Sequence, residues 1–177
     1  MTKHFANIIT MSNLVFGFLS LHYTMVDRVN MAAMMIICSV IMDSMDGRIA
    51  RHFDTVGDIG KNLDSLCDLV SFGIAPALLV YQFTLVDYSY WGMIPCILFC
   101  LSGAYRLARF NVACISAYFV GVPITFAGGL VAALSILLPH MSSLTWMIIL
   151  LLLAILMVSY LKVPKMGNKN KNGEENA

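Results

Sequence analysis

The sequence predicts an all-α fold, a polytopic membrane protein with six transmembrane helices and both termini in the cytoplasm. Of its 177 residues, 59% are hydrophobic and only 12% are charged, whereas a soluble domain averages about 45–50% apolar and about 25% charged residues. So little charge cannot cover a soluble monomer of this size, and the composition also excludes disordered and disulfide-rich secreted proteins. The net charge of +1 provides no basic field for nucleic acid, which is not expected as a partner.

The apolar runs predict about six crossings of a bilayer, each of which takes roughly 20 helical residues. Short connections between them leave little room for a soluble domain. We therefore expect one transmembrane domain over residues 1–163 and a polar, disordered cytoplasmic tail over residues 164–177. No small-residue cleavage site follows the first run, so it should remain as a span. The predicted spans are 8–26, 31–50, 63–83, 91–110, 118–139 and 144–163.

The basic residues predict the orientation in the membrane. When the N-terminus is placed in the cytoplasm, only Arg28, beside Asp27 in an outer turn, falls on the outer side. This bias is a strong positive-inside signal, and it predicts a multi-pass protein of the cell (plasma) membrane. The ten basic residues on the cytoplasmic side are Lys3, Arg48, Arg51, Lys61, Arg106, Arg109, Lys162, Lys165, Lys169 and Lys171.

Most of the acidic residues lie in the second and third spans and in the connection between them. Six of the ten lie between residues 43 and 68. The apolar run 31–42 is too short to cross a bilayer, so the second helix must continue through Asp43 and Asp46, and the third begins with Asp64 and Asp68. An Asp at the centre of a transmembrane helix costs about 2.5–3.5 kcal/mol, and less near an interface. Four such residues require a compensating ligand or partner.

Helix geometry predicts that these four carboxylates converge. Asp43 and Asp46 share one helix face at i, i+3, and Asp64 and Asp68 share a face at i, i+4. The polar connection 52–62 is short enough to make the two helices antiparallel neighbours. Four oxygen ligands suit two hard divalent cations, Mg²⁺ or Mn²⁺, with shared carboxylates. The alternative is that the aspartates pair with nearby basic residues or are hydrated at the membrane surface.

Two features of the later spans have packing interpretations. Cys96 and Cys100 share a helix face and could hold half of a metal site, but small apolar packing residues are the simpler interpretation. The pair Gly128 and Gly129 could seat a partner helix.

The acidic segment resembles the signature of the CDP-alcohol phosphotransferase family. That signature is D-x2-D-G-x2-A-R-x8-G-x3-D-x3-D, and all eight fixed positions are met over the 26 residues from Asp43 to Asp68. Six spans, with the motif at the end of the second and the start of the third, also resemble the family fold. A match of this length in the required membrane setting carries little risk of coincidence.

Other stretches resemble the membrane-embedded (type II) bacterial branch of the family, which uses L-serine as the acceptor. In that branch a proline usually precedes the first Asn of the opening motif, whereas this chain has Ala6. The resemblance implies transfer of a phosphatidyl group from CDP-diacylglycerol to L-serine, with release of CMP and with two divalent cations as cofactors. A homodimer is typical of the relatives. The stretches are 7–13, 65–77, 102–111 and 118–123.

The resemblance also implies roles for individual residues. Asp43, Asp46 and Asp64 would hold the first metal, and Asp43, Asp64 and Asp68 the second, with Asp68 also acting as the general base and hence as the catalytic residue. An active site at the cytoplasmic face follows. The residues expected to bind CDP-diacylglycerol are Asn7, Thr10, Gly47, Arg51, Gly57 and Gly60.

Arg106, Arg109 and Asn111 end the fourth span on the same side as the aspartates. We hypothesise that they bind the donor phosphate or the serine carboxylate, which suits the planar guanidinium group. The alternative is a basic anchor that reaches the lipid headgroups.

Two other functions stay open. The same motif serves acceptors such as glycerol 3-phosphate or inositol. A small cation transporter would use the acidic cluster as a relay, but the absence of charge between Tyr118 and Leu161 disfavours a pathway to the outer leaflet.

Overall fold

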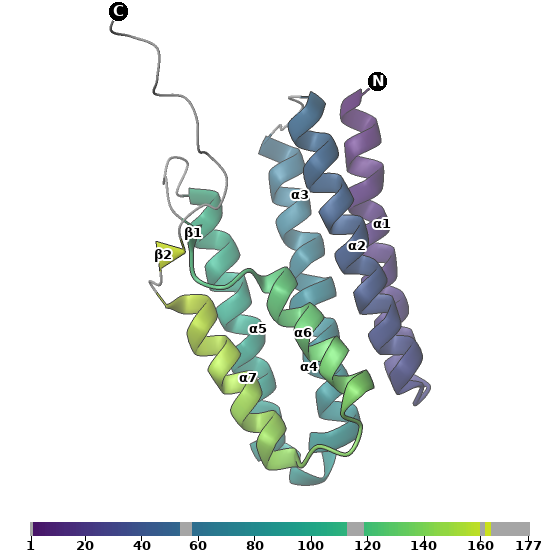
Figure 1. Cartoon of the computed structure of the whole chain (residues 1–177), viewed down its shortest axis with the longest axis vertical. Helices are drawn as coiled ribbons and strands as arrows, with labels where there is room; N and C mark the ends of the chain where they lie inside the picture. The colour runs from purple at the N-terminus through teal and green to yellow at the C-terminus, as the bar shows by residue number, and fades with distance from the viewer. Residues whose placement is uncertain (1, 54–57, 113–118, 160–161, 164–177) are drawn as a thin grey trace, which may run out of the picture.

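The computed structural model shows six helical rods joined mostly by short turns (Figure 1). It describes the backbone of residues 2–53, 58–112, 119–159 and 162–163, and the side chains of residues 10–45, 59–112 and 121–159. The first two rods are α1 (Thr2–Met25) and α2 (Val29–Phe53). The third rod is a continuous run of α3 (Asp58–Asp68), the π-helix η1 (Leu69–Ile74), α4 (Ala75–Val80) and the π-helix η2 (Tyr81–Leu85). The remaining elements are η3 (Val86–Tyr88), α5 (Ser89–Val112), β1 (Phe119–Val120), α6 (Ile124–Leu137), α7 (Ser143–Val158) and β2 (Lys162–Val163).

The helical fold agrees with the sequence prediction, and the rods follow the predicted spans with shifted ends. The polar connection before the third rod is shorter than expected, because α2 continues to Phe53 and α3 begins at Asp58. The fifth rod begins at Ile124 rather than at residue 118, because Gly121 has a positive φ of 81° and the extended Pro123 caps the helix. Residues 119–120 instead pair with residues 162–163 as two short antiparallel strands.

One continuous helical stretch within the described part of the chain, Ile59–Val112, is long and apolar enough to cross a membrane. It reverses direction near Ser89, whose φ is 47°, so it provides two antiparallel rods (Figure 1). Three shorter apolar helices are Val29–Met45, Ile124–Leu137 and Ser143–Val158.

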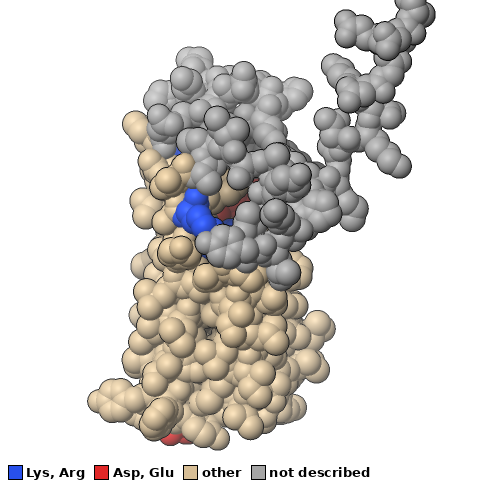
Figure 2. Space-filling model, turned by 90° about the vertical axis from the view of Figure 1, so that its left-hand side faces the viewer, with Lys and Arg blue, Asp and Glu red and all other residues tan. Residues whose placement is uncertain are grey.

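The outer surface of the rods is apolar, while polar side chains lie inside. Phe18 is 67% exposed and Ile155 is 70% exposed, whereas Asn13, Ser39 and Ser71 are buried. On the face drawn in Figure 2, the described charged side chains lie toward the two ends, and a broad uncharged band separates them. This distribution suits lipid as the solvent, where small and polar side chains join helices to one another.

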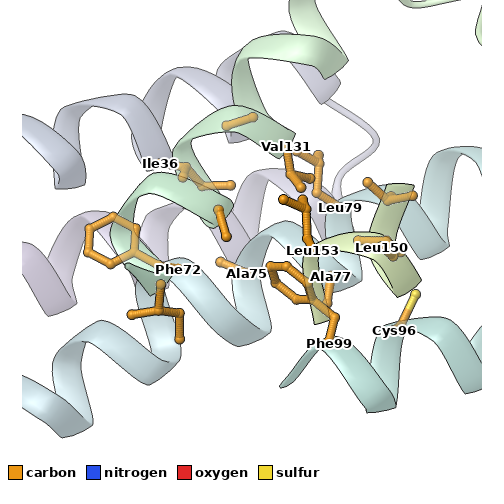
Figure 3. Close-up of a cluster of buried hydrophobic side chains, with 14 of the residues drawn as sticks. Ile36, Phe72, Ala75, Ala77, Leu79, Cys96, Phe99, Val131, Leu150 and Leu153 are labelled. Atoms are coloured by element: carbon orange, nitrogen blue, oxygen red, sulfur yellow. The ribbon is translucent and has the colours of Figure 1, made fainter. Parts of the chain in front are cut away.

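The apolar core lies where α2, η1, α4, α5, α6 and α7 meet, around Phe72, Phe99 and Leu150 (Figure 3). The Gly128–Gly129 pair seats helices of this chain itself. A Cβ atom on Gly128 would lie 2.5 Å from the Phe72 carbonyl oxygen, and one on Gly129 would lie 3.2 Å from Val40 Cγ2. Glycine at these positions therefore allows α6 to approach η1 and α2.

Candidate active site

Three of the four predicted acidic ligands meet at one end of the bundle. Carboxylate oxygens of Asp43 on α2 and of Asp64 and Asp68 on α3 all lie within 4.8 Å of one another. Asp68 is buried, and the other two are half-buried. The predicted spacing therefore does bring these side chains together. The fourth, Asp46, belongs to α2, and its side chain lies outside the described residues.

Helix α1 lies next to this cluster, because it packs against α2, α3 and η1. Its residue Asn13 donates a hydrogen bond from Nδ2 to Asp68 Oδ1 at 3.1 Å. Ser39 on α2 donates to the Asn13 main-chain oxygen at 3.0 Å and also contacts its side-chain oxygen. Ser71 on η1 donates to the same main-chain oxygen at 3.1 Å. Three helical elements are thus joined at Asn13, beside Asp68.

No role for Asn13 was predicted from the sequence. The one indication in the sequence was that Asn13 is an amide within the predicted first span, and a buried polar group needs hydrogen-bond partners. Those partners lie 26, 55 and 58 positions along the chain, so the run itself does not identify them.

The π-helix η1 begins directly after Asp68. Single π-helical turns are frequent at functional sites, and this one carries Ser71 to α1. The close approach depends on Gly17, where a Cβ atom would overlap Ser71 Oγ and would lie 3.0 Å from Ser71 Cα. The sequence did not predict this π-helix.

Arg106 on α5 is buried with 8% of its surface exposed, and it interacts electrostatically with Asp68. Its Nε atom has no hydrogen-bond partner among the described residues. A buried guanidinium nitrogen of this kind can donate a hydrogen bond to an anionic group of a ligand.

The other two candidates on α5 contact neighbouring rods. Arg109 donates from Nη1 to the Val158 carbonyl at 3.4 Å, toward the end of α7. Asn111 donates from Nδ2 to Ser65 Oγ at 2.9 Å, and its carbonyl accepts from Lys61 Nζ at 3.2 Å. These bonds tie the end of α5 to α3, next to Asp64.

The remaining predicted site residues are only partly described. Thr10 is buried on α1, one turn before Asn13, and Gly60 is half-buried in the first turn of α3. Gly57 lies outside the described residues altogether. Residues whose backbone is helical but whose side chains lie outside the described part are Asn7, Gly47 and Arg51.

The donor set fits a hard divalent cation. All three gathered ligands are carboxylates, and oxygen ligands of this kind are those that Mg²⁺ and Mn²⁺ prefer. Cys96 and Cys100 lie apart from the cluster, and their thiols donate to the carbonyls of Gly92 and Gly73. Their contacts agree with the packing interpretation.

A family model described as CDP-alcohol phosphatidyltransferase matches residues 3–160. Among curated proteins, the CDP-diacylglycerol–serine O-phosphatidyltransferase of Helicobacter pylori is 34% identical over 169 residues, which cover 90% of this chain and 71% of that protein. The protein of the same name from Methanocaldococcus jannaschii is 38% identical over 164 residues, covering 93% and 75%. The one from Bacillus subtilis is 33% identical over 159 residues, covering 89% and 85%.

Proposed function

We propose that this chain, which belongs to the CDP-alcohol phosphatidyltransferase family, transfers the phosphatidyl group of CDP-diacylglycerol to the hydroxyl of L-serine. The products are phosphatidylserine and CMP. The observation that carries the chemistry is the meeting of Asp43, Asp64 and Asp68 at one end of the bundle. The choice of serine is supported by the names of relatives that are similar over most of this chain.

We assign two divalent cations, Mg²⁺ or Mn²⁺, to the acidic cluster. Asp43, Asp46 and Asp64 would hold the first, and Asp43, Asp64 and Asp68 the second. Such ions neutralise charge on the two phosphates and stabilise the leaving CMP. The carboxylates in turn favour such ions, since three acidic side chains this close together repel one another.

Asp68 is assigned as the general base. A serine hydroxyl is a weak nucleophile until a base within hydrogen-bonding reach takes its proton. In the proposed reaction the hydroxyl oxygen bonds to the phosphatidyl phosphorus and its proton passes to Asp68. The bond from that phosphorus to the CMP oxygen breaks, and CMP leaves with the electron pair. Asp68 lies one helical turn deeper in the bundle than Asp64, on the side where the lipid portion of the donor would remain.

Arg106 is assigned to an anionic group of the substrates, either the donor phosphate or the serine carboxylate. Arg106 is buried, it interacts electrostatically with Asp68, and its Nε atom donates no hydrogen bond to any described residue. These three properties support the binding of an anion better than a role as an anchor at the lipid headgroups. We include Arg109 and Asn111 in the same anion site, where their bonds to α7 and α3 hold the end of α5 in place.

The nucleotide portion of the donor is assigned to the cytoplasmic end of the first three rods. Small residues there, such as Gly47, Gly57 and Gly60, would leave room for the cytidine and its phosphates. The residues proposed for this role are Asn7, Thr10, Gly47, Arg51, Gly57 and Gly60.

We further propose that the six rods are six membrane spans of the cell membrane, with both termini and the acidic cluster at the cytoplasmic face. The apolar outer surface and the collection of basic residues near the cluster support this orientation. The acyl chains of the donor then stay in the bilayer while its headgroup meets serine at the membrane surface. A homodimer is expected by analogy with the family.

The decisive experiment supplies purified protein with CDP-diacylglycerol and labelled L-serine, with and without Mn²⁺ or Mg²⁺. We expect metal-dependent formation of labelled phosphatidylserine and release of CMP. Parallel reactions with glycerol 3-phosphate and inositol test the other acceptors. Metal-independent turnover, or full activity of Asp68→Asn, would contradict the mechanism, and preference for another acceptor would contradict the choice of serine.

A further inference from the structure

We propose that Asn13 is a positioning residue, which fixes one oxygen of Asp68 and thereby sets how this carboxylate faces the metals and the acceptor hydroxyl. The proposal relies on the function given above only for the role of Asp68. It concerns a residue of α1, outside the acidic motif on α2 and α3.

The side chain of Asn13 uses both of its polar ends. Its Nδ2 atom donates to Asp68 Oδ1 at 3.1 Å, and its Oδ1 atom contacts the Ser39 hydroxyl. Both Asn13 and Asp68 are buried, with 1% and 7% of their surfaces exposed. In such surroundings water does not replace a lost partner, so the bond to Asp68 restrains the carboxylate more firmly than it would at the surface.

The orientation of the Asn13 amide follows from these two contacts. If the amide were turned over, its oxygen would face the carboxylate oxygen of Asp68, and two acceptors would oppose each other. The observed orientation gives the carboxylate a donor, and the Asn13 side-chain and main-chain oxygens share the single proton of the Ser39 hydroxyl. The amide is therefore held in the one orientation that binds Asp68.

The main chain of Asn13 is held as well. Ser39 from α2 and Ser71 from η1 donate to its carbonyl oxygen at 3.0 and 3.1 Å. Gly17, one turn further along α1, allows η1 to approach closely enough for the Ser71 bond. Asn13 is thus a fixed point between the helix that carries Asp43 and the helix that carries Asp68.

A general packing role does not account for this arrangement. Two other buried polar residues on the same face of α1 do not contact the acidic cluster. Thr24 donates to the carbonyl of Ser20 within α1, and the Ser20 hydroxyl has no partner among the described residues. Of these three buried residues of α1, Asn13 is the one whose side chain bonds to Asp68.

The consequence for the site is that Asp68 offers its two oxygens unequally. Oδ1 carries the bond from Asn13, so a metal or the acceptor hydroxyl can use the other oxygen without breaking that bond. Partners that orient a metal ligand in this way typically change metal affinity or activity by about 10–100-fold when they are removed.

The test replaces Asn13 by leucine, which has a similar volume and cannot donate. Mn²⁺ binding to the purified protein without substrates is measured by electron paramagnetic resonance, together with kcat, KM for CDP-diacylglycerol and Tm. We expect Asn13→Leu to weaken Mn²⁺ binding and to lower kcat by about 10–100-fold each, with KM for the donor changed less than about threefold. Ser20→Ala, on the same face of α1, should leave Mn²⁺ binding, kcat and KM unchanged.

Mn²⁺ binding and kcat within twofold of the original chain in folded Asn13→Leu would overturn the proposal. If that variant does not fold, Ser39→Ala carries the test, because it removes the contact that orients the amide. It should weaken Mn²⁺ binding severalfold, and unchanged binding would overturn the proposal. Failure of the original chain to make phosphatidylserine would refute the proposed function instead, since the Mn²⁺ measurement does not depend on turnover.

Discussion

Replacing Gly17 by alanine should impair catalysis more than stability, because of where the added methyl group would lie. The Cβ atom would overlap Ser71 Oγ and would lie 3.0 Å from Ser71 Cα and 3.1 Å from Ser71 Cβ. Ordinary carbon contacts begin near 3.4 Å, so the main chain of η1 has to retreat by about 0.4 Å (3.4 − 3.0) even after the hydroxyl rotates away. Catalytic groups generally have to be held within about 0.5 Å of their productive positions.

Asp68 is three residues before Ser71 in the same helical run, so the displacement is transmitted to it. We expect kcat for phosphatidylserine formation to fall by at least about tenfold, since misplacement by about 1 Å can cost 10²-fold. The loss of stability should be small. Overpacking costs about 1–3 kcal/mol, while alanine recovers as much as about 1 kcal/mol relative to glycine within a helix.

The matched control is Gly92→Ala on α5. Its Cβ atom would overlap the carbonyl oxygen of Leu85 and lie 2.9 Å from Leu85 Cβ, which is an equally severe contact at the opposite end of the bundle from Asp68. This variant should lower Tm without lowering kcat per folded molecule. Initial rates in mixed micelles and thermal unfolding of both variants make the comparison. Equal loss of kcat in the two variants, or an unimpaired Gly17→Ala, would refute the reasoning.

Three further predictions address the site and its surroundings. Asp64→Asn should abolish measurable turnover and weaken Mn²⁺ binding, measured by calorimetry, by at least about tenfold. Mn²⁺ binding equal to that of the original chain would show that Asp64 is not a metal ligand. Arg106→Lys should raise KM for serine or lower kcat by about tenfold or more, because an ammonium group cannot reproduce a bidentate guanidinium contact. If Arg106 were only an anchor, steady-state kinetics would show little change in either quantity. Cys100→Ala should keep full activity and lower stability by about 1 kcal/mol, since its thiol contributes one weak bond to the Gly73 carbonyl; loss of bound metal in this variant would contradict the packing interpretation.

The sequence predicted those parts of the structure that depend on spacing within one helix. Asp64 and Asp68, four residues apart, share one face of an α-helix, and the apolar runs mark the rods. The π-helix η1 could not be predicted in this way, since an apolar run has the same composition whichever hydrogen-bond pattern its backbone adopts. The start of α6 was missed for a related reason. Residues 118–123 are mostly apolar, but Gly121 has a positive φ and Pro123 is extended, and neither conformation continues a helix.

In the proposed membrane setting, the role of α1 follows from the bilayer as a solvent. Lipid provides no hydrophobic force to press one helix against another, so association depends on close packing and on hydrogen bonds. Two helices that each carry carboxylates also repel each other at the site. The buried face of α1 answers both requirements, because its small and polar residues recur at the spacing of a helix stripe: Thr10, Asn13, Gly17, Ser20 and Thr24. Within this stripe, Gly17 admits η1 and Asn13 bonds to Ser39, Ser71 and Asp68. In this setting α1 thus holds α2 and the third rod together beside the acidic cluster, and it does so with residues that lie outside the motif.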